Sequence, residues 1–237
     1  MKPFMQGELL KKNMLQHHRQ LEEIYLITSN KAKPIFYSNH RSRQACQKSY
    51  KLSDDKIKIA KQSLQNKNKN FLEIGFGAGD SVINMLCDKP NNYYCIESYY
   101  RGIENLNNLI KKNNLKNIFV FHGDAIDIIE NFFPNDSIDY IHIFFPDPWP
   151  KKKHRKRRLI NLYSIDMLFS KLKENGKFHF TTDHINYAYS VRDMLSKQLK
   201  KSVYFSSNRG LRPITSYEKK AYKKNNLIFD LIEIKVF

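Results

Sequence analysis

From residue 70 to the C-terminus, short β-rich runs alternate with segments of helical character, and this alternation constrains the fold most. Strands that alternate with helices predict a mostly parallel sheet with helices on both faces. The runs are almost continuously apolar, as expected for strands that are buried on two sides. The five runs are FLEIGF (71–76), YYCIES (93–98), IFVFHGD (118–124), IDYIHIFF (138–145) and GKFHFTTDH (176–184).

The remaining segments complete the pattern of an α/β, Rossmann-like fold. A sixth β-rich run, NLIFDLIEIKVF (226–237), follows no clear helix. We therefore expect it to run antiparallel at or near the edge of the sheet. The predicted helices lie near 80–88, 100–113, 125–132, 159–173 and 186–200.

The region before the sheet has a different character, and we predict two parts for the chain. Residues 1–60 are expected to form a basic N-terminal helix or arm, and residues 61–237 the α/β domain. Leucines and isoleucines between residues 8 and 26 indicate an amphipathic helix. Residues 39–56 show little periodicity of either kind and are predicted to form a basic loop.

The charge of the chain indicates a polyanionic partner. Lys and Arg number 41 against 23 Asp and Glu, which gives a formal net charge of +18. Nucleic acid is a better candidate than a membrane, because the sequence has no long apolar helix and no signal peptide. Cys46, Cys87 and Cys95 lack metal-ligand spacing, so we expect no metal site and a reducing compartment, the cytoplasm.

The first predicted strand ends in a glycine-rich turn, Glu73-Ile74-Gly75-Phe76-Gly77-Ala78-Gly79. Ligands of open α/β sheets bind beyond the carboxyl ends of the strands, and glycines let the backbone approach them closely. A dinucleotide-binding turn would place its third glycine at Asp80. The observed spacing is instead typical of S-adenosylmethionine, whose cationic head suits Glu73. Glu73, Gly75 and Gly77 are therefore candidate cofactor-binding residues, unless the glycines only serve a flexible junction.

The next two strands also end in acids. Glu97 ends the second strand, where a carboxylate can accept hydrogen bonds from both ribose hydroxyls of a nucleoside. Asp124 ends the third strand and can accept a hydrogen bond from the exocyclic amine of adenine. Asp124 can equally be the N-cap of the helix that follows. Three successive strand ends with acids favour a nucleoside-containing cofactor.

The fourth strand ends in the stretch FFPDPWPKKKHRKRR (144–158). Pro146 and Pro148 restrict the backbone on either side of Asp147. Trp149 offers a flat face on which a base can stack. Seven of the eight residues 151–158 are Lys or Arg, and they are predicted to begin the next helix and bind phosphates. A solvated helix face is the alternative explanation for this run.

The motifs FLEIGFGAG, CIES, HGDA, FFPDPWPKKKHRKRR, TTDH and RPITSYE occur in this order. Over roughly residues 35–237, the chain thereby resembles the bacterial tRNA (guanine-N7-)-methyltransferase family. The resemblance implies a class I methyltransferase that uses S-adenosylmethionine to methylate N7 of a guanine in the variable loop of tRNA. It implies that the cofactor and reaction site is lined by Glu73, Glu97, Asp124 and Asp147. It also implies substrate contacts from Lys151, Asp183, Thr215, Ser216, Tyr217 and Glu218.

The implied chemistry agrees with the residues at the strand ends. Guanine N7 has a lone pair and no proton to remove, so the reaction needs alignment of donor and acceptor more than a strong base. Asp147 is the catalytic candidate, because a carboxylate can stabilise the purine as it becomes cationic. Asp183 can help in the same way, and no metal is needed.

Two other functions stay open from the sequence alone. One is a methyltransferase for another RNA base, although exocyclic-amine enzymes usually carry a second proline where Trp149 stands. The other is a non-catalytic RNA-binding protein on a methyltransferase fold, against which the intact glycine turn argues. The segment Thr215–Ala221 departs from the usual pattern of the family. With tRNA as the partner, we expect a monomer or weak homodimer and no protein partner.

Overall fold

The computed structural model describes residues 52–85 and 90–235. The predicted helix within residues 8–26, most of the predicted loop 39–56, Cys46 and Cys87 lie outside the described residues. The division of the chain at residues 60 and 61 stays a prediction. Helix α2 (Asp54–Ser63) spans this position and packs on the α/β domain through Ala60, which is fully buried.

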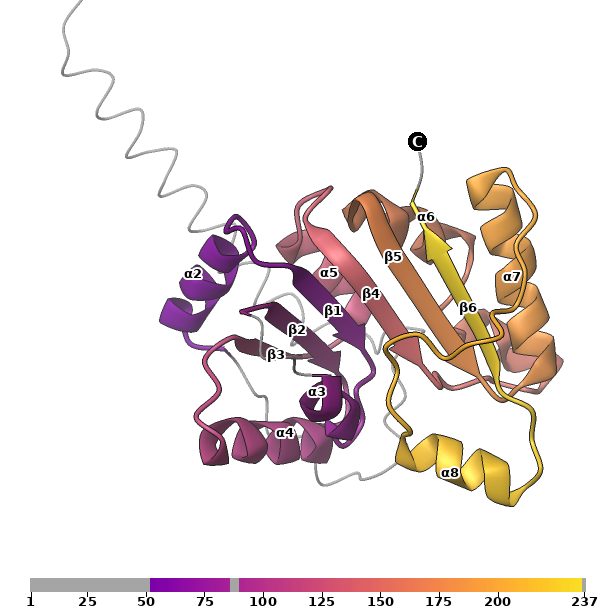
Figure 1. The fold of residues 1–237 in the computed structure, drawn as a ribbon, viewed down its shortest axis with the longest axis horizontal. Coiled ribbons are helices and arrows are strands. Elements are labelled where there is room, and N and C mark those ends of the chain that lie inside the picture. Colours follow the sequence, from indigo (N-terminus) through magenta and orange to yellow (C-terminus); the bar gives the residue numbers. More distant parts are fainter. Residues whose placement is uncertain (1–51, 86–89, 236–237) are drawn as a thin grey trace, which may run out of the picture. The chain divides into compact units, whose positions relative to one another are not determined.

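Six strands form one sheet in the order β3-β2-β1-β4-β5-β6 (Figure 1). The first five strands are parallel, and β6 pairs antiparallel with β5 at the edge, which confirms the predicted topology. The strand order reverses between β1 and β4, and sheets of this kind bind ligands at such a switch point. The strands are β1 (Asn70–Ile74), β2 (Asn92–Glu97), β3 (Ile118–His122), β4 (Ile138–Phe144), β5 (Leu172–Thr182) and β6 (Phe229–Ile234).

Helices cover both faces of the sheet, as the alternation predicted (Figure 1). Helices α2, α5, α6 and α7 pack with Tyr94, Ile141 and Phe178 in one core. Helices α3 and α4 pack on the other face of β1, β2 and β3. None of the helices described here is long and apolar enough to cross a membrane. The bounds are α3 (Asp80–Met85), α4 (Tyr100–Lys112), α5 (Ala125–Phe132), α6 (Leu162–Lys171), α7 (Ile185–Leu199) and α8 (Ser216–Lys223).

Strand β5 begins earlier than the predicted run 176–184. It starts at Leu172, directly after α6, where the sequence predicted that the helix continues to residue 173. The register against β4 shifts between Ile138 and Tyr140. Between these two positions β5 contains more residues than β4. Asn175 lies in this stretch of β5, and its left-handed φ of 60° lets the backbone bend there.

Two further elements differ from the predictions. The basic run does not begin the next helix: Lys152–Arg157 form a separate 3-10 helix, η2, and α6 begins only after the capping box at Asn161. Helix α8 was not predicted at all. Its sequence, SYEKKAYK, buries only Glu218 and Ala221 and therefore has no apolar stripe that would identify it.

Candidate active site

The carboxyl ends of β1, β2, β3 and β4 open onto a cleft of about 490 Å³. The glycine turn, the loop after β4 and α8 form its walls. The predicted site residues that line it are Gly75, Gly77, Glu97, Asp124, Asp147 and Tyr217. A small pocket of about 20 Å³ shares part of this wall and includes Glu73, Gly75, Thr215, Ser216 and Tyr217.

The glycine turn needs its glycines for conformation. Gly75, Gly77 and Gly79 have φ values of 78°, 60° and 89°, a region in which side chains are strained. The turn also needs space on α4, because a Cβ at Gly102 would lie 2.0 Å from the carbonyl oxygen of Gly77. The sequence did not single out Gly102, since only the fold brings it against the turn.

Glu97 holds the backbone of the turn. Its Oε2 accepts a hydrogen bond from Gly77 N at 2.8 Å, and Oε1 accepts from Ser98 N at 2.7 Å and Tyr99 N at 2.9 Å. Burial raises the pKa of this carboxyl, and the backbone donors oppose the rise. Because a carboxylate oxygen can accept more than one hydrogen bond, Oε2 retains capacity for a hydroxyl in the cleft.

Glu73 lies against the small pocket and is only 5% exposed. Its Oε1 accepts a hydrogen bond from Ser81 Oγ on α3. Its Oε2 is buried and has no hydrogen-bond partner within the described part of the chain. Burial raises the pKa of Glu73 to about 7, with Ser81 lowering it and Glu97 raising it further. A buried polar atom without a partner costs free energy, which a ligand that donates hydrogen bonds would offset.

Asp124 is the N-cap of α5, which confirms the capping alternative. Its Oδ1 accepts hydrogen bonds from Ile126 N at 2.9 Å and Asp127 N at 3.3 Å. Burial raises the pKa of this carboxyl. The cap uses only Oδ1 and Asp124 lines the cleft, so a contact of Oδ2 with adenine stays a prediction.

A strained loop presents Asp147 at the cleft. Phe145 and Trp149, on either side of the Pro-Asp-Pro sequence, have left-handed φ values of 51° and 43°. Bulky residues rarely adopt this conformation, and where they do, it often marks a functional site. Phe145 N donates to Thr181 O at 2.8 Å and ties the loop to β5. The prolines predicted a rigid frame, but the sequence did not reveal the two strained residues.

Trp149 also lines the cleft, and a cation occupies one face of its ring. The guanidinium carbon of Arg157 lies 5.0 Å from the ring centroid, and His154 contacts the ring at 5.9 Å with perpendicular planes. A base that stacks on Trp149, as predicted, must use the other face or replace Arg157.

The basic run divides into exposed and buried members. The exposed members are Lys151, Lys152, Lys153, Arg155 and Lys156, and they form no ion pairs with other described residues. The prediction that Arg158 belongs to the phosphate-binding cluster is wrong, because its side chain is 5% exposed. Arg158 Nε donates to Pro148 O at 2.9 Å and its guanidinium lies over the Tyr187 ring at 4.5 Å. Arg158 therefore anchors the loop that carries Asp147.

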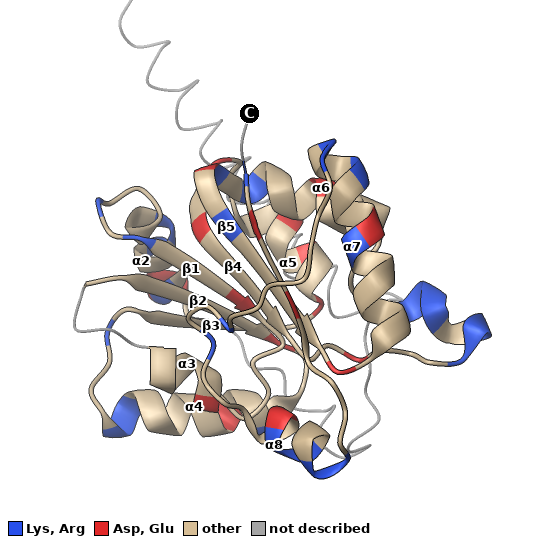
Figure 2. Cartoon of the chain, turned by 45° about the vertical axis from the view of Figure 1, so that its right-hand side comes forward, with Lys and Arg blue, Asp and Glu red and all other residues tan. Residues whose placement is uncertain are grey.

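Helix α8 forms the opposite wall. Thr215 caps it by accepting a hydrogen bond from Glu218 N at 3.2 Å, and Ser216 is exposed. Tyr217 packs against the glycine turn, with its Cε2 3.6 Å from the position of a Cβ at Gly77. Glu218 is completely buried, so its predicted contact with substrate is not formed in this geometry and stays a prediction. The exposed side chains of α8 include Lys219, Lys220 and Lys223, and its C-cap Lys224 is also exposed. Figure 2 shows these basic segments of α8 in blue.

Asp183 lies just beyond β5 and is absent from the lining of the two pockets described. Its Oδ2 accepts a hydrogen bond from Asn226 Nδ2 at 2.9 Å. This bond connects the end of β5 to the segment before β6. A contact between Asp183 and substrate stays a prediction.

The cleft has features that fit S-adenosylmethionine. In the small pocket beside the cleft, Oε2 of Glu73 has no hydrogen-bond partner among the described residues, so it can accept a hydrogen bond from a ligand or bind a cation. At Gly75 there is open space, because a Cβ there would meet nothing within 4 Å. A ligand can therefore approach the turn at Gly75 closely. Within residues 52–85 and 90–235, no three His, Cys, Asp or Glu side chains form a group that could hold a metal ion.

Comparison with known proteins gives concordant results. Residues 67–231 match the family model described as putative methyltransferase. The tRNA (guanine-N(7)-)-methyltransferase of Francisella philomiragia is 36% identical over 73% of this chain and 77% of its own. The enzyme of that name from Francisella tularensis subspecies novicida is 38% identical over 72% and 76%. An antibiotic-related methyltransferase structure shares the fold, with a TM-score of 0.53 and 14% identity over 79% of this chain and 97% of that one. The chain thus belongs to the tRNA (guanine-N7-)-methyltransferase family.

Proposed function

We propose that this protein transfers the methyl group of S-adenosylmethionine to N7 of a guanine in the variable loop of tRNA. The observation that carries the proposal is the convergence of Glu97, Asp124 and Asp147 on one cleft with the glycine turn. The name of the relatives supports guanine N7 of tRNA as the acceptor. The same proposal includes a cytoplasmic location and action as a monomer or weak homodimer.

S-Adenosylmethionine, when bound, supplies an electrophilic methyl group on a sulfonium. Glu97 would accept hydrogen bonds from its ribose hydroxyls, and Asp124 would border its adenine. Glu73 would face the cationic amino-acid head through Oε2, in a pocket of about 20 Å³ that suits a group of the size of water or ammonium. The glycine turn would let the backbone lie against the ligand.

Asp147 would act on the guanine. Its carboxylate is exposed at the cleft and can accept hydrogen bonds from the N–H edge of the base. As N7 takes the methyl group, the purine gains positive charge, which a fixed carboxylate stabilises. The lining of the cleft contains no His or Lys side chain among the described residues. N7 has no proton to lose, so it suits a site without such a base.

The basic elements beside the cleft would bind the tRNA backbone. Lys151 and the exposed residues of η2 lie next to the loop that carries Asp147, and α8 together with its C-cap Lys224 presents four exposed lysines. Phosphate contacts of this kind supply much of the affinity for nucleic acid and fix its orientation. Base recognition would then depend on the cleft.

The proposal is tested by incubating the protein with labelled S-adenosylmethionine and total tRNA and identifying the modified nucleoside. We expect 7-methylguanosine in the variable loop. A matched tRNA with 7-deazaguanine at that position keeps the N–H edge but replaces the nucleophilic nitrogen by carbon. It should bind normally and accept no methyl group there. Methylation of the 7-deazaguanine base at the normal rate would show that another atom is the acceptor.

A further inference from the structure

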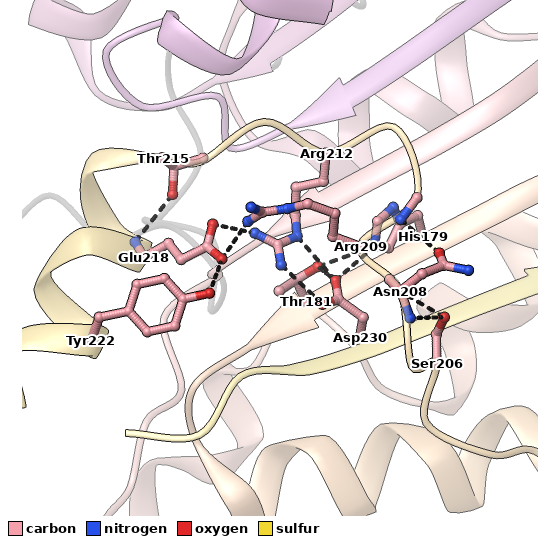
Figure 3. A network of polar contacts seen from close by, with 11 residues as sticks. His179, Thr181, Ser206, Asn208, Arg209, Arg212, Thr215, Glu218, Tyr222 and Asp230 are labelled. Carbon is pink, nitrogen blue, oxygen red and sulfur yellow. Dashed lines mark hydrogen bonds and ion pairs between the residues drawn. The ribbon is translucent and has the colours of Figure 1, made fainter. Parts of the chain in front are cut away.

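A group of charged and polar side chains, most of them buried, connects α8 to the edge of the sheet (Figure 3). We call it the Arg212 network. None of its members lines either pocket, so direct contact with a ligand there does not explain its buried charges. Its members are His179, Thr181, Arg209, Arg212, Glu218, Tyr222 and Asp230.

Arg212 is the centre of this network and is 3% exposed. Its Nε and Nη2 donate to the two carboxylate oxygens of Asp230 on β6, at 3.0 and 2.9 Å. Burial alone would raise the pKa of Asp230, but hydrogen bonds from His179, Arg212 and Thr181 lower it to about 2. Asp230 is therefore an ionised anchor at the sheet edge to which Arg212 is fixed by a bidentate pair.

Arg212 reaches two elements of the active site from this anchor. Its Nη1 donates to Glu218, in the first turn of α8. Its guanidinium carbon also lies 5.6 Å from the centroid of the Phe145 ring. Phe145 is one of the two strained residues of the Asp147 loop. One buried cation thus contacts the sheet, the helix opposite the glycine turn and the loop of Asp147.

Glu218 is 0% exposed and receives donors from three side chains. Arg209 and Tyr222 donate to Oε1, the latter at 2.8 Å, and Arg212 donates to Oε2. A carboxylate this deeply buried is costly unless such donors hold it in one geometry. The ion pairs therefore fix the position of the first turn of α8.

Tyr217 precedes Glu218 in the first turn of α8, so the position of Glu218 determines where the Tyr217 ring lies in the cleft. Its ring packs on Gly77 and lines both the large cleft and the small pocket beside Glu73. A shift of α8 would change the width of the small pocket directly. The network and the pocket are thus connected through one helical turn.

We propose that Arg212 and Glu218 are positioning residues that hold Tyr217 over the glycine turn and so set the affinity for the cofactor. This inference rests on the proposed function for the identity of the ligand. It differs from the resemblance of the chain to its family, which implies that Glu218 contacts the substrate. A contact with guanine would affect tRNA binding, whereas a positioning role affects cofactor binding even without tRNA.

A double-mutant cycle on cofactor affinity separates the two roles. The dissociation constant of S-adenosylmethionine is measured by calorimetry, without tRNA, for wild type, Tyr217→Ala, Glu218→Gln and the double variant. Loss of the Tyr217 ring should weaken binding by about 3- to 10-fold, the size of an aromatic contact. Glu218→Gln should weaken it by a similar factor. Both changes remove the same contact of Tyr217 with the cofactor pocket. The double variant should therefore bind S-adenosylmethionine as tightly as the single variant with the lower affinity.

Two results would overturn the proposal. One is unchanged cofactor affinity in Glu218→Gln together with a raised KM for tRNA. The other is a double variant in which the two factors multiply, which would show that Glu218 does not act through Tyr217. A wild-type protein that binds the cofactor but modifies no tRNA would contradict the proposed function and leave the inference intact.

A milder variant covers the case in which Glu218→Gln does not fold. Arg209→Met removes one of the two ion pairs of Glu218, and the side chain of Arg209 is 36% exposed. Amide hydrogen exchange should become faster in α8 of Arg209→Met, while the amides of β1 change little. Unchanged exchange in α8 would show that the ion pairs do not fix the helix, and the proposal would fail without any ligand being needed.

Discussion

Two groups of basic side chains flank the active-site cleft, and their surroundings are opposite. In η2 and the residue before it, Lys151, Lys152, Lys153, Arg155 and Lys156 are exposed and have no ion pairs with described residues. In the Arg212 network, Arg212 is buried and paired with both Asp230 and Glu218. Both groups contain arginine side chains that are alike in sequence, but the fold gives the two groups different tasks.

The difference teaches how to separate charges for a partner from charges for the fold. Exposed lysines and arginines keep their hydration, contribute little to stability and remain available to phosphates. A buried arginine with two carboxylates is bound in one geometry, and removing one partner leaves an uncompensated charge. Both kinds of charge can occur within one basic run. Arg158 follows the exposed lysines and arginines of residues 151–156 in sequence and is itself buried.

The largest effect is expected from Arg212→Met, which removes the central cation of the buried group. Asp230 and Glu218 would lose a shared cation in a buried place, so the free energy of unfolding should fall by about 3–5 kcal/mol. Chemical denaturation measures it. Arg209→Met is the matched control, since among the described residues Arg209 forms an ion pair only with Glu218 and its side chain is 36% exposed. A loss for Arg212→Met no larger than that for Arg209→Met would contradict the central position of Arg212.

Asp147→Ala should have the next largest effect, on catalysis rather than stability. Asp147 is exposed at the cleft, and removing one electrostatic stabiliser costs about 10²-fold in turnover. Methyl transfer to tRNA and cofactor affinity are both measured, and cofactor affinity should change little. Asp147→Asn keeps the shape of the side chain and should lose activity to a similar extent, because the charge stabilises the cationic purine. Near-normal turnover in either variant would remove Asp147 from the catalytic role.

Much of the fold and part of the site followed from local sequence patterns. The six strands, the parallel pairing of the first five and the antiparallel pairing of the sixth are confirmed, because the pattern of apolar residues reflects which side chains are buried. The glycine turn and the acids Glu97 and Asp124 are brought to one cleft because each ends a parallel strand. A strand end is visible in the sequence, and the sheet places the ends together.

The parts that sequence did not reveal depend on contacts between distant segments. Gly102 is needed because α4 meets the glycine turn, which lies more than twenty residues earlier. Helix α8 has no apolar stripe, since its inward face carries the buried carboxylate of Glu218 instead of leucines. The sequence around Arg158 and Arg212 does not distinguish them from surface arginines. Each is buried because the fold brings it to a distant acceptor, Pro148 for Arg158 and Asp230 for Arg212.

The exposed end of the comparison is tested by replacing Lys153, Arg155 and Lys156 with Ala. If each meets a phosphate, the salt dependence of tRNA binding should lose about 0.7–0.9 in log-log slope per residue. Over a fourfold increase in salt, three lost contacts amount to a change of about 20- to 40-fold. Stability should stay unchanged, because these side chains are exposed and unpaired in the described part.

The matched control removes equal charge from the opposite end of the strands, near the amino end of β3. Lys111, Lys112 and Lys116 are exposed near the end of α4, close to the amino end of β3 and away from the cleft. Their replacement by Ala should leave the salt slope unchanged. Equal slopes for the two triple variants would assign η2 to a solvated face, and the exposed group would lose its proposed partner.

Glu73 is the case between the two groups, because its carboxyl is buried but has no cation among the described residues. Burial raises its pKa to about 7 from 4.5, so the carboxyl is mostly neutral below pH 7. The cationic head of the cofactor needs the ionised form, and its affinity should therefore rise with pH and level off above about 7. Binding at pH 6 should be about tenfold weaker than at pH 8. The free energy of unfolding has the opposite pH dependence. Between pH 4.5 and about 7, Glu73 holds its proton in the folded state but has released it in the unfolded state. Its contribution therefore lowers the stability of the protein as the pH rises through this range.

Calorimetry of cofactor binding between pH 6 and 8 measures this effect in wild type, Glu73→Gln and Glu104→Gln. Glu73→Gln should bind weakly at every pH and remove most of the dependence, because the titrating group is gone. Glu104→Gln is the matched control, since Glu104 is an exposed acid on α4 that lines neither of the two pockets described. It should keep the wild-type profile. Glu97 also has a pKa raised by burial, and a profile that persists in Glu73→Gln would move the titration from Glu73 to Glu97.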